Sequence, residues 1–204
     1  MNTNYQQILE EIFEETQALR GAGKVADYIP ALKQVNPDQY GIAIQTLGGE
    51  TFQVGDAVVP FSIQSISKVF VLVMVLREIG DELWQRVGRE PSGSAFNSLV
   101  QLETEHGIPR NPFINAGALV ATDHLVSQSA DPMSDILRFV REVSNNPDVN
   151  FNEVVAISEK QSGFRNAALI NLGSRSKRWV VRHFKWGMRP SLFQYRVFQK
   201  SLCW

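Results

Sequence analysis

Eight consecutive apolar residues, 69–76, directly follow a polar segment that ends at Lys68, and this junction constrains the fold more than any other part of the sequence. A helix that is apolar around its whole circumference belongs in a protein core, buried on every side. Pro60 and Ser62 stand just upstream, where the start of a helix is expected. The sequence therefore predicts a core helix whose first turn carries polar side chains.

Ser65 and Lys68 are three residues apart at this helix start, so they share a face of the first turn. A lysine amine at the mouth of an apolar core is easily desolvated, and desolvation lowers its pKa and favours the neutral base. Such a Ser-x-x-Lys pair can activate a hydroxyl without histidine. The structural alternative is that Ser65 caps the helix and Lys68 extends to the surface. A second copy, Ser174 to Lys177, has no apolar helix after it, and we interpret it as chance.

The composition indicates a soluble globular protein with one sizeable domain, since 44% of the 204 residues are hydrophobic and 20% are charged. A single cysteine, Cys203, suits a reducing compartment. We expect a cytoplasmic protein, because the N-terminus lacks the features of a signal peptide and the apolar run is too short to span a bilayer. No metal or organic cofactor is expected, because the histidines are scattered and no Gly-rich phosphate loop occurs.

The periodicity predicts an alternation of helices with one hairpin, which is an α/β class of fold. Two glycines, Gly48 and Gly49, mark the hairpin turn. The expected elements are an amphipathic helix over 4–20, strands over 40–45 and 51–54, the core helix, a short helix over 81–87, a helical turn over 99–105, a buried helix after Pro112, an amphipathic helix over 133–143, and a helix over 154–171 that breaks at Gly163.

Three further polar residues are candidates for a site. Asn115 lies where two prolines lead into a run of small residues, and its structural alternative is a helix cap. Glu159 and Asn166 are about two helical turns apart, so both can face one side of a helix. Their structural alternative is an ordinary solvated face.

The composition changes abruptly near Leu172. Residues 173–204 hold eight of the twenty Lys and Arg residues, none of the 21 Asp and Glu residues, and three of the four tryptophans. A basic tail with interleaved aromatic residues can bind nucleic acid or an anionic membrane. However, its apolar residues follow no sustained period, so we interpret 173–204 as an unrelated tail that follows a disrupted reading frame or gene.

Several long runs resemble the bacterial serine-dependent glutaminases over about residues 5–172. These runs are KVADYIP (24–30), FSIQSISK (61–68), PSG (91–93), FNS (96–98), GIPRNPFINAGA (107–118), SE (158–159) and GFRN (163–166). The resemblance implies that residues 1–172 are the N-terminal part of a glutaminase catalytic domain. It also implies a sheet with flanking helices, similar to β-lactamases and penicillin-binding transpeptidases, with its C-terminal part missing or replaced.

The resemblance further implies hydrolysis of L-glutamine to L-glutamate and ammonia. Ser65 matches the nucleophile of the family and Lys68 its general base, while Asn115, Glu159 and Asn166 match residues that bind the substrate, as Ser65 also does. It implies a homo-oligomer, a tetramer, for the full-length form, with no metal, no cofactor, and neither nucleic acid nor membrane as a partner.

The sequence departs from the family pattern beyond residue 172. A tyrosine that the family uses would fall near Pro190, where no tyrosine stands, and the positions of a second tyrosine and an oxyanion-hole group do not occur in this chain. We therefore expect little activity and low stability from the chain alone. The alternatives are a catalytically inactive product, a binding protein that uses the basic tail, and, less favoured, a β-lactam-binding relative.

Overall fold

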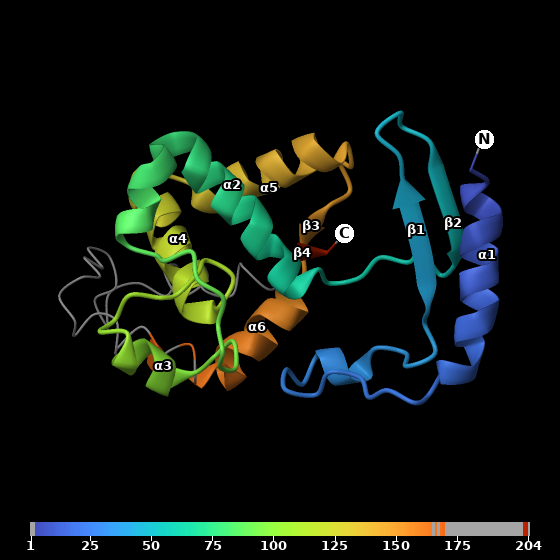
Figure 1. Cartoon of the computed structure of the whole chain (residues 1–204), viewed down its shortest axis with the longest axis horizontal. Helices are drawn as coiled ribbons and strands as arrows, with labels where there is room; N and C mark the ends of the chain where they lie inside the picture. The colour runs from blue at the N-terminus through green and yellow to red at the C-terminus, as the bar shows by residue number, and fades with distance from the viewer. Residues whose placement is uncertain (1–2, 165, 167, 170–201, 204) are drawn as a thin grey trace. The chain divides into compact units, whose positions relative to one another are not determined.

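The computed structural model describes residues 3–164, 166, 168–169 and 202–203 (Figure 1). Two compact units divide the chain, Met1–Phe61 and Ser62–Trp204. The described part is mixed α/β and mostly helical, and its strands form two separate two-stranded sheets. The α/β class is thereby confirmed, while the larger β-lactamase-like sheet stays a prediction.

The N-terminal unit is a hairpin with one helix packed on it (Figure 1). Strands β1, Gly41–Gln45, and β2, Thr51–Gly55, pair antiparallel, with Ile44 opposite Phe52. Helix α1, Tyr5–Thr16, continues into a 3₁₀ turn, η1, Gln17–Leu19. A second 3₁₀ turn, η2, Leu32–Gln34, precedes the hairpin. The predicted hairpin is confirmed.

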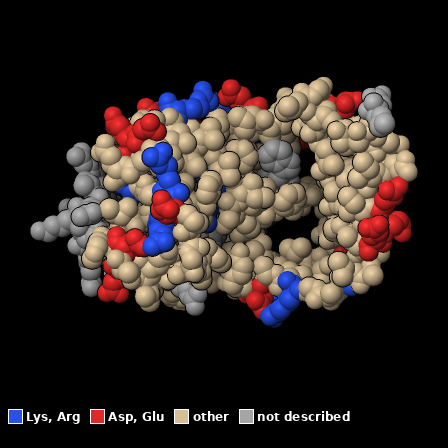
Figure 2. All heavy atoms as spheres, in the orientation of Figure 1, with Lys and Arg blue, Asp and Glu red and all other residues tan. Residues whose placement is uncertain are grey.

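Helix α1 buries a different face from the one predicted. Leu9 is buried, whereas Ile8 and Ile12 are exposed. The ring of Phe13 stacks on Tyr40, with the two centroids 5.2 Å apart. The hairpin offers only one face, so it covers a narrower stripe than the four apolar positions suggested. In Figure 2, acidic side chains gather over the opposite side of α1, which carries Glu10, Glu11, Glu14 and Glu15.

The C-terminal unit is a group of helices around one core. A 3₁₀ turn, η3, Gln64–Ile66, leads into α2, Ser67–Ile79, and η4, Gly80–Gln85, follows. The remaining helices are α3, Leu99–Thr104; α4, Asn115–Gln128; α5, Pro132–Ser144; and α6, Glu153–Ser162. Helix α2 packs against both α4 and α5. The helices predicted over 99–105 and 133–143 are confirmed within a residue or two. The helix predicted over 154–171 is confirmed as far as Ser162, next to Gly163, and residues 165, 167, 170 and 171 lie outside the described residues.

Helix α2 corrects the prediction that its apolar run is buried on every side. Val71 and Val75 are fully buried in the core, but Val69 is 46% and Val73 is 39% exposed. Among the described elements, α4 and α5 pack against the core side of α2, which carries Val71 and Val75, and an apolar sequence does not by itself bury the opposite side.

Strand β3, Asn150–Phe151, pairs antiparallel with β4, Leu202–Cys203. The rest of the predicted tail, 173–201 and 204, lies outside the described residues. None of the helices within the described ranges is long and apolar enough to cross a lipid bilayer.

Candidate functional site

Ser65 lies in the 3₁₀ turn η3 rather than in α2 itself, and it is exposed. The preceding residue, Gln64, has φ +48°, a left-handed conformation that costs a non-glycine residue free energy. The Gln64 side chain donates to Ser62 Oγ at 2.7 Å, and Ser67 Oγ donates to the Gln64 carbonyl oxygen at 2.7 Å. The strained turn is thus bonded on both sides and presents Ser65 to solvent.

Lys68 is buried, with 5% of its surface exposed, so the structural alternative that it extends to the surface is wrong. Its Nζ donates to the Phe113 carbonyl oxygen at 2.8 Å and to Asn115 Oδ1 at 2.9 Å. It also lies 6.0 Å from the centroid of the Phe96 ring. Within the described residues, no hydrogen bond joins the Ser65 hydroxyl to this amine.

Asn115 is the first residue of α4, and its side chain does not cap that helix. It is buried, with 4% exposed, and it links two other candidates: Oδ1 accepts from Lys68, and Nδ2 donates to Asn166 Oδ1 at 2.9 Å. The structure thus brings Lys68, Asn115 and Asn166 into one hydrogen-bonded chain. The three residues come from segments far apart in the sequence.

A small residue at the start of α4, Gly117, allows the segment that contacts Lys68 to lie close to this helix. A Cβ atom on Gly117 would lie 1.9 Å from the Asn111 carbonyl oxygen and 2.9 Å from Pro112 Cα. Only glycine lets the 109–114 segment lie this close to the first turn of α4. The segment then delivers the Phe113 carbonyl oxygen to Lys68.

Glu159 lies in α6 and is 5% exposed, so the structural alternative of an ordinary solvated face is wrong for this residue. A carboxylate that is largely removed from water needs a partner of opposite charge or several hydrogen-bond donors. Burial at this position is therefore more typical of a binding or catalytic group than of a surface acid.

Two contacts to Lys68 escaped the sequence reasoning. The Phe113 contact uses a backbone carbonyl, which no side-chain pattern can indicate. Phe96 belongs to one of the runs that carried the resemblance, but nothing in its sequence pattern indicates that its ring lies near Lys68. The Phe96 carbonyl oxygen also accepts a hydrogen bond from the Asn115 N–H at 2.8 Å.

The described residues hold no group of three or more His, Cys, Asp or Glu side chains that could ligate a metal.

Comparison with known proteins gives a consistent family. The glutaminase family model matches residues 23–180, so the match ends beyond residue 172. The glutaminase of Agrobacterium fabrum is 54% identical over 168 residues, which cover 81% of this chain and 54% of that protein. The glutaminase of Aliarcobacter butzleri is 58% identical over 170 residues, covering 83% and 56%. The chain spans about half the length of these relatives.

Solved structures agree. A probable glutaminase, ybaS, superposes with a TM-score of 0.85 at 27% identity, covering 100% of this chain and 64% of that one. A probable glutaminase from Bacillus subtilis, complexed with 6-diazo-5-oxo-L-norleucine, gives a TM-score of 0.75 at 26% identity, covering 100% and 61%. On the family match and these relatives together, the chain belongs to the glutaminase family.

Proposed function

We propose that this chain carries the nucleophile and the base of a glutaminase, and that the reaction is hydrolysis of L-glutamine to L-glutamate and ammonia. The observation that carries the proposal is the buried Lys68 amine, bonded to two oxygens, three residues after an exposed serine. Both oxygens accept hydrogen bonds from Nζ, and a lysine amine in its neutral form can take the proton of a hydroxyl.

Ser65 Oγ attacks the side-chain amide carbon of glutamine while Lys68 Nζ takes the hydroxyl proton. The tetrahedral intermediate collapses, its C–N bond breaks, and the proton held by Lys68 leaves with ammonia. A water molecule then attacks the glutamyl ester, gives its proton to Lys68, and releases glutamate and the Ser65 hydroxyl. Atoms and charge balance without a cofactor.

Glu159, Asn115 and Asn166 serve the substrate in this proposal. The buried Glu159 carboxylate suits the α-ammonium of an amino acid, because the two groups carry opposite charges. Asn166 Oδ1 accepts a hydrogen bond from Asn115. The Nδ2 group of Asn166 therefore points away from Asn115, and its N–H donors suit the α-carboxylate of the substrate. The assigned chemistry is therefore a site for a zwitterion.

We propose weak turnover for the 204-residue chain by itself. It spans about half the length of these relatives, and the family resemblance ends near residue 172, before the positions of the tyrosines and the oxyanion-hole group that it implies. Loss of one oxyanion-hole donor costs about 10²–10³ in rate. The chain can therefore retain attack by the Ser65 hydroxyl even where the complete reaction is slow.

The test separates attack from turnover. The diazoketone 6-diazo-5-oxo-L-norleucine, which accompanies the Bacillus subtilis relative, alkylates a nucleophile and releases N₂. We expect the intact mass of the chain to rise by the reagent less N₂, on a peptide that contains Ser65, with excess L-glutamine protecting it. Ammonia release from glutamine is measured in parallel.

The matched control is the second Ser-x-x-Lys copy. Ser65→Ala should abolish labelling and any turnover, whereas Ser174→Ala should change neither. Labelling that survives Ser65→Ala would refute the proposed nucleophile, and so would labelling that glutamine does not reduce.

A further inference from the structure

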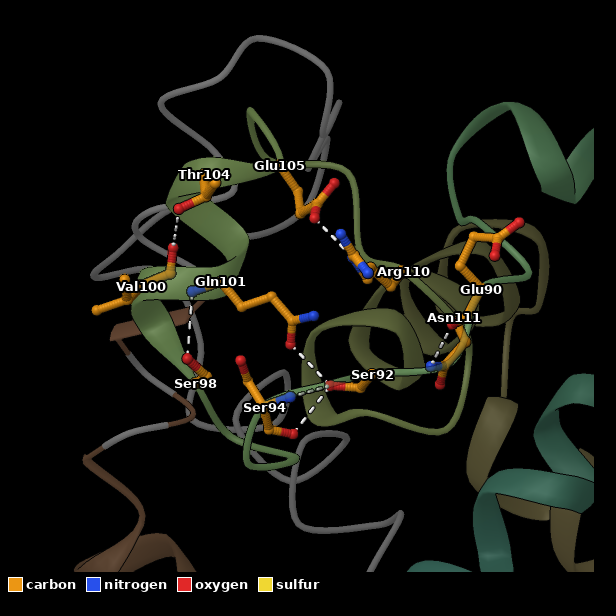
Figure 3. Close-up of polar contacts among 10 residues, drawn as sticks. All are labelled: Glu90, Ser92, Ser94, Ser98, Val100, Gln101, Thr104, Glu105, Arg110 and Asn111. Carbon is orange, nitrogen blue, oxygen red and sulfur yellow. Dashed lines mark hydrogen bonds and ion pairs between the residues drawn. The ribbon is translucent and has the colours of Figure 1, made fainter.

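One side chain, that of Asn111, ties together the two segments that surround Lys68. Its Oδ1 accepts from the backbone N–H groups of Phe113 at 3.0 Å and Ile114 at 3.1 Å. Its Nδ2 donates to the Glu90 carbonyl oxygen at 2.9 Å, a contact drawn in Figure 3. Three hydrogen bonds therefore converge on one amide.

Each of the two segments contributes one contact to the Lys68 amine. The 109–114 segment presents the Phe113 carbonyl oxygen, 2.8 Å from Nζ. The 88–98 segment presents the Phe96 ring, 6.0 Å from Nζ. The segments also pair directly, because the Gly88 N–H donates to Pro109 O at 2.7 Å and the Glu90 N–H to Arg110 O at 2.9 Å.

We propose that Asn111 is a positioning residue for the Lys68 amine. It fixes the turn that places the Phe113 carbonyl oxygen and holds the neighbouring segment in register, and it acts only through Lys68. Its meaning for catalysis rests on the proposed function, but its hold on Lys68 can be measured without turnover.

The two halves of the amide can be separated by substitution. Asn111→Asp keeps an oxygen acceptor for the Phe113 and Ile114 N–H groups and loses the donor to Glu90. Asn111→Ala loses both. The carbonyl that bonds Lys68 lies on the acceptor side, so the aspartate should retain most of the effect and the alanine none of it.

The experiment is trace acetylation of the folded chain with acetic anhydride at fixed pH, with mass spectrometry reporting each lysine. The rate at Lys68 is divided by the rate at exposed Lys33 in the same sample. We expect Asn111→Ala to raise this ratio about tenfold, the scale of one to two lost hydrogen bonds. Asn111→Asp should raise it less than about threefold.

Two controls exclude trivial causes. Arg110→Gln removes the neighbouring side chain, whose Nε bonds Glu105 Oε1 at 2.6 Å, and should leave the ratio unchanged (Figure 3). Leu102→Ala empties a buried position of α3 and should lower Tm without raising the ratio. A ratio in Asn111→Ala equal to that of the parent chain would overturn the proposal. An equal rise in Leu102→Ala would also overturn it, because simple loosening would then suffice.

In any chain that turns over glutamine, Asn111→Ala should lower kcat with KM nearly unchanged, and Asn111→Asp should restore much of the loss. A raised KM with unchanged kcat would contradict a role through Lys68. A parent chain without Ser65 labelling would refute the proposed function and leave the acetylation result intact.

Discussion

Helices α2 and α4 pack against each other, and in each of them the burial of side chains differs from what the sequence suggests, in opposite directions. The all-apolar run of α2 leaves Val69 and Val73 exposed, whereas α4 buries the polar residues Asn115, Thr122 and Asp123. Each of these three has a partner: Asn115 bonds Lys68, Thr122 Oγ1 donates to the Ala118 carbonyl oxygen at 2.9 Å, and Asp123 pairs with Arg86 at 2.8 Å. Burial follows from neighbours and partners, and composition alone does not decide it.

The largest effect should come from the small-residue start of α4. Gly117→Val should destabilise the chain by about 3 kcal/mol or more, because its side chain would overlap the backbone of Asn111 and Pro112. The free energy of unfolding in urea measures this. Gly93→Ala is the matched control, since a Cβ at Gly93 meets no atom within 4 Å. Equal stability of the two variants would show that the 109–114 segment can move away at little cost.

The two faces of α2 provide the next test. Val75→Ala should cost about 2 kcal/mol, since Val75 is fully buried, while Val73→Ala should cost less than about 1 kcal/mol. Both remove the same two methyl groups from one helix, so helix propensity cancels in the comparison. Similar urea midpoints for the two variants would mean that Val73 is covered in solution.

The buried polar side of α4 should respond less. Asp123→Asn should cost about 1–2 kcal/mol, because it leaves Arg86 without its carboxylate but keeps a hydrogen-bond acceptor. The estimate stays below that for a fully buried pair, since the Arg86 side chain is 29% exposed. Measuring Arg86→Gln and the double variant as well gives the coupling energy between the two side chains. A coupling energy near zero would show that the ion pair does not explain why α4 tolerates a buried acid.

The smallest effect concerns the start of α5, where the Asp131 side chain accepts hydrogen bonds from Ser134 in the first turn. The hydrogen bonds from Ser134, with Oγ at 2.6 Å and N at 3.2 Å, hold the pKa of Asp131 below its ordinary value. A lowered pKa in the folded state contributes stability above the unfolded pKa, and this is lost as the pH falls through the folded pKa. Asp131→Asn should therefore unfold earlier than the parent chain at pH 7, and the Tm difference should shrink below about pH 4, the ordinary pKa of an aspartate. A Tm difference that persists unchanged into acid would contradict this origin.

The local elements followed from the sequence because their causes are local. The glycines of the hairpin and the prolines before α4 act on their own backbone. The family runs likewise marked Ser65, Lys68, Asn115, Glu159 and Asn166 as candidates, and three of these five now lie in one hydrogen-bonded chain.

Which face each helix buries was decided only by tertiary structure. A one-dimensional pattern gives the apolar positions but does not say how many neighbours arrive, and so Ile8, Ile12, Val69 and Val73 remained exposed. The site needed the same information. Lys68 is held by a backbone carbonyl 45 residues away and by an amide 47 residues away, and the close approach at Gly117 brings them together. A carbonyl carries no residue-specific signal, so only the folded chain could place it.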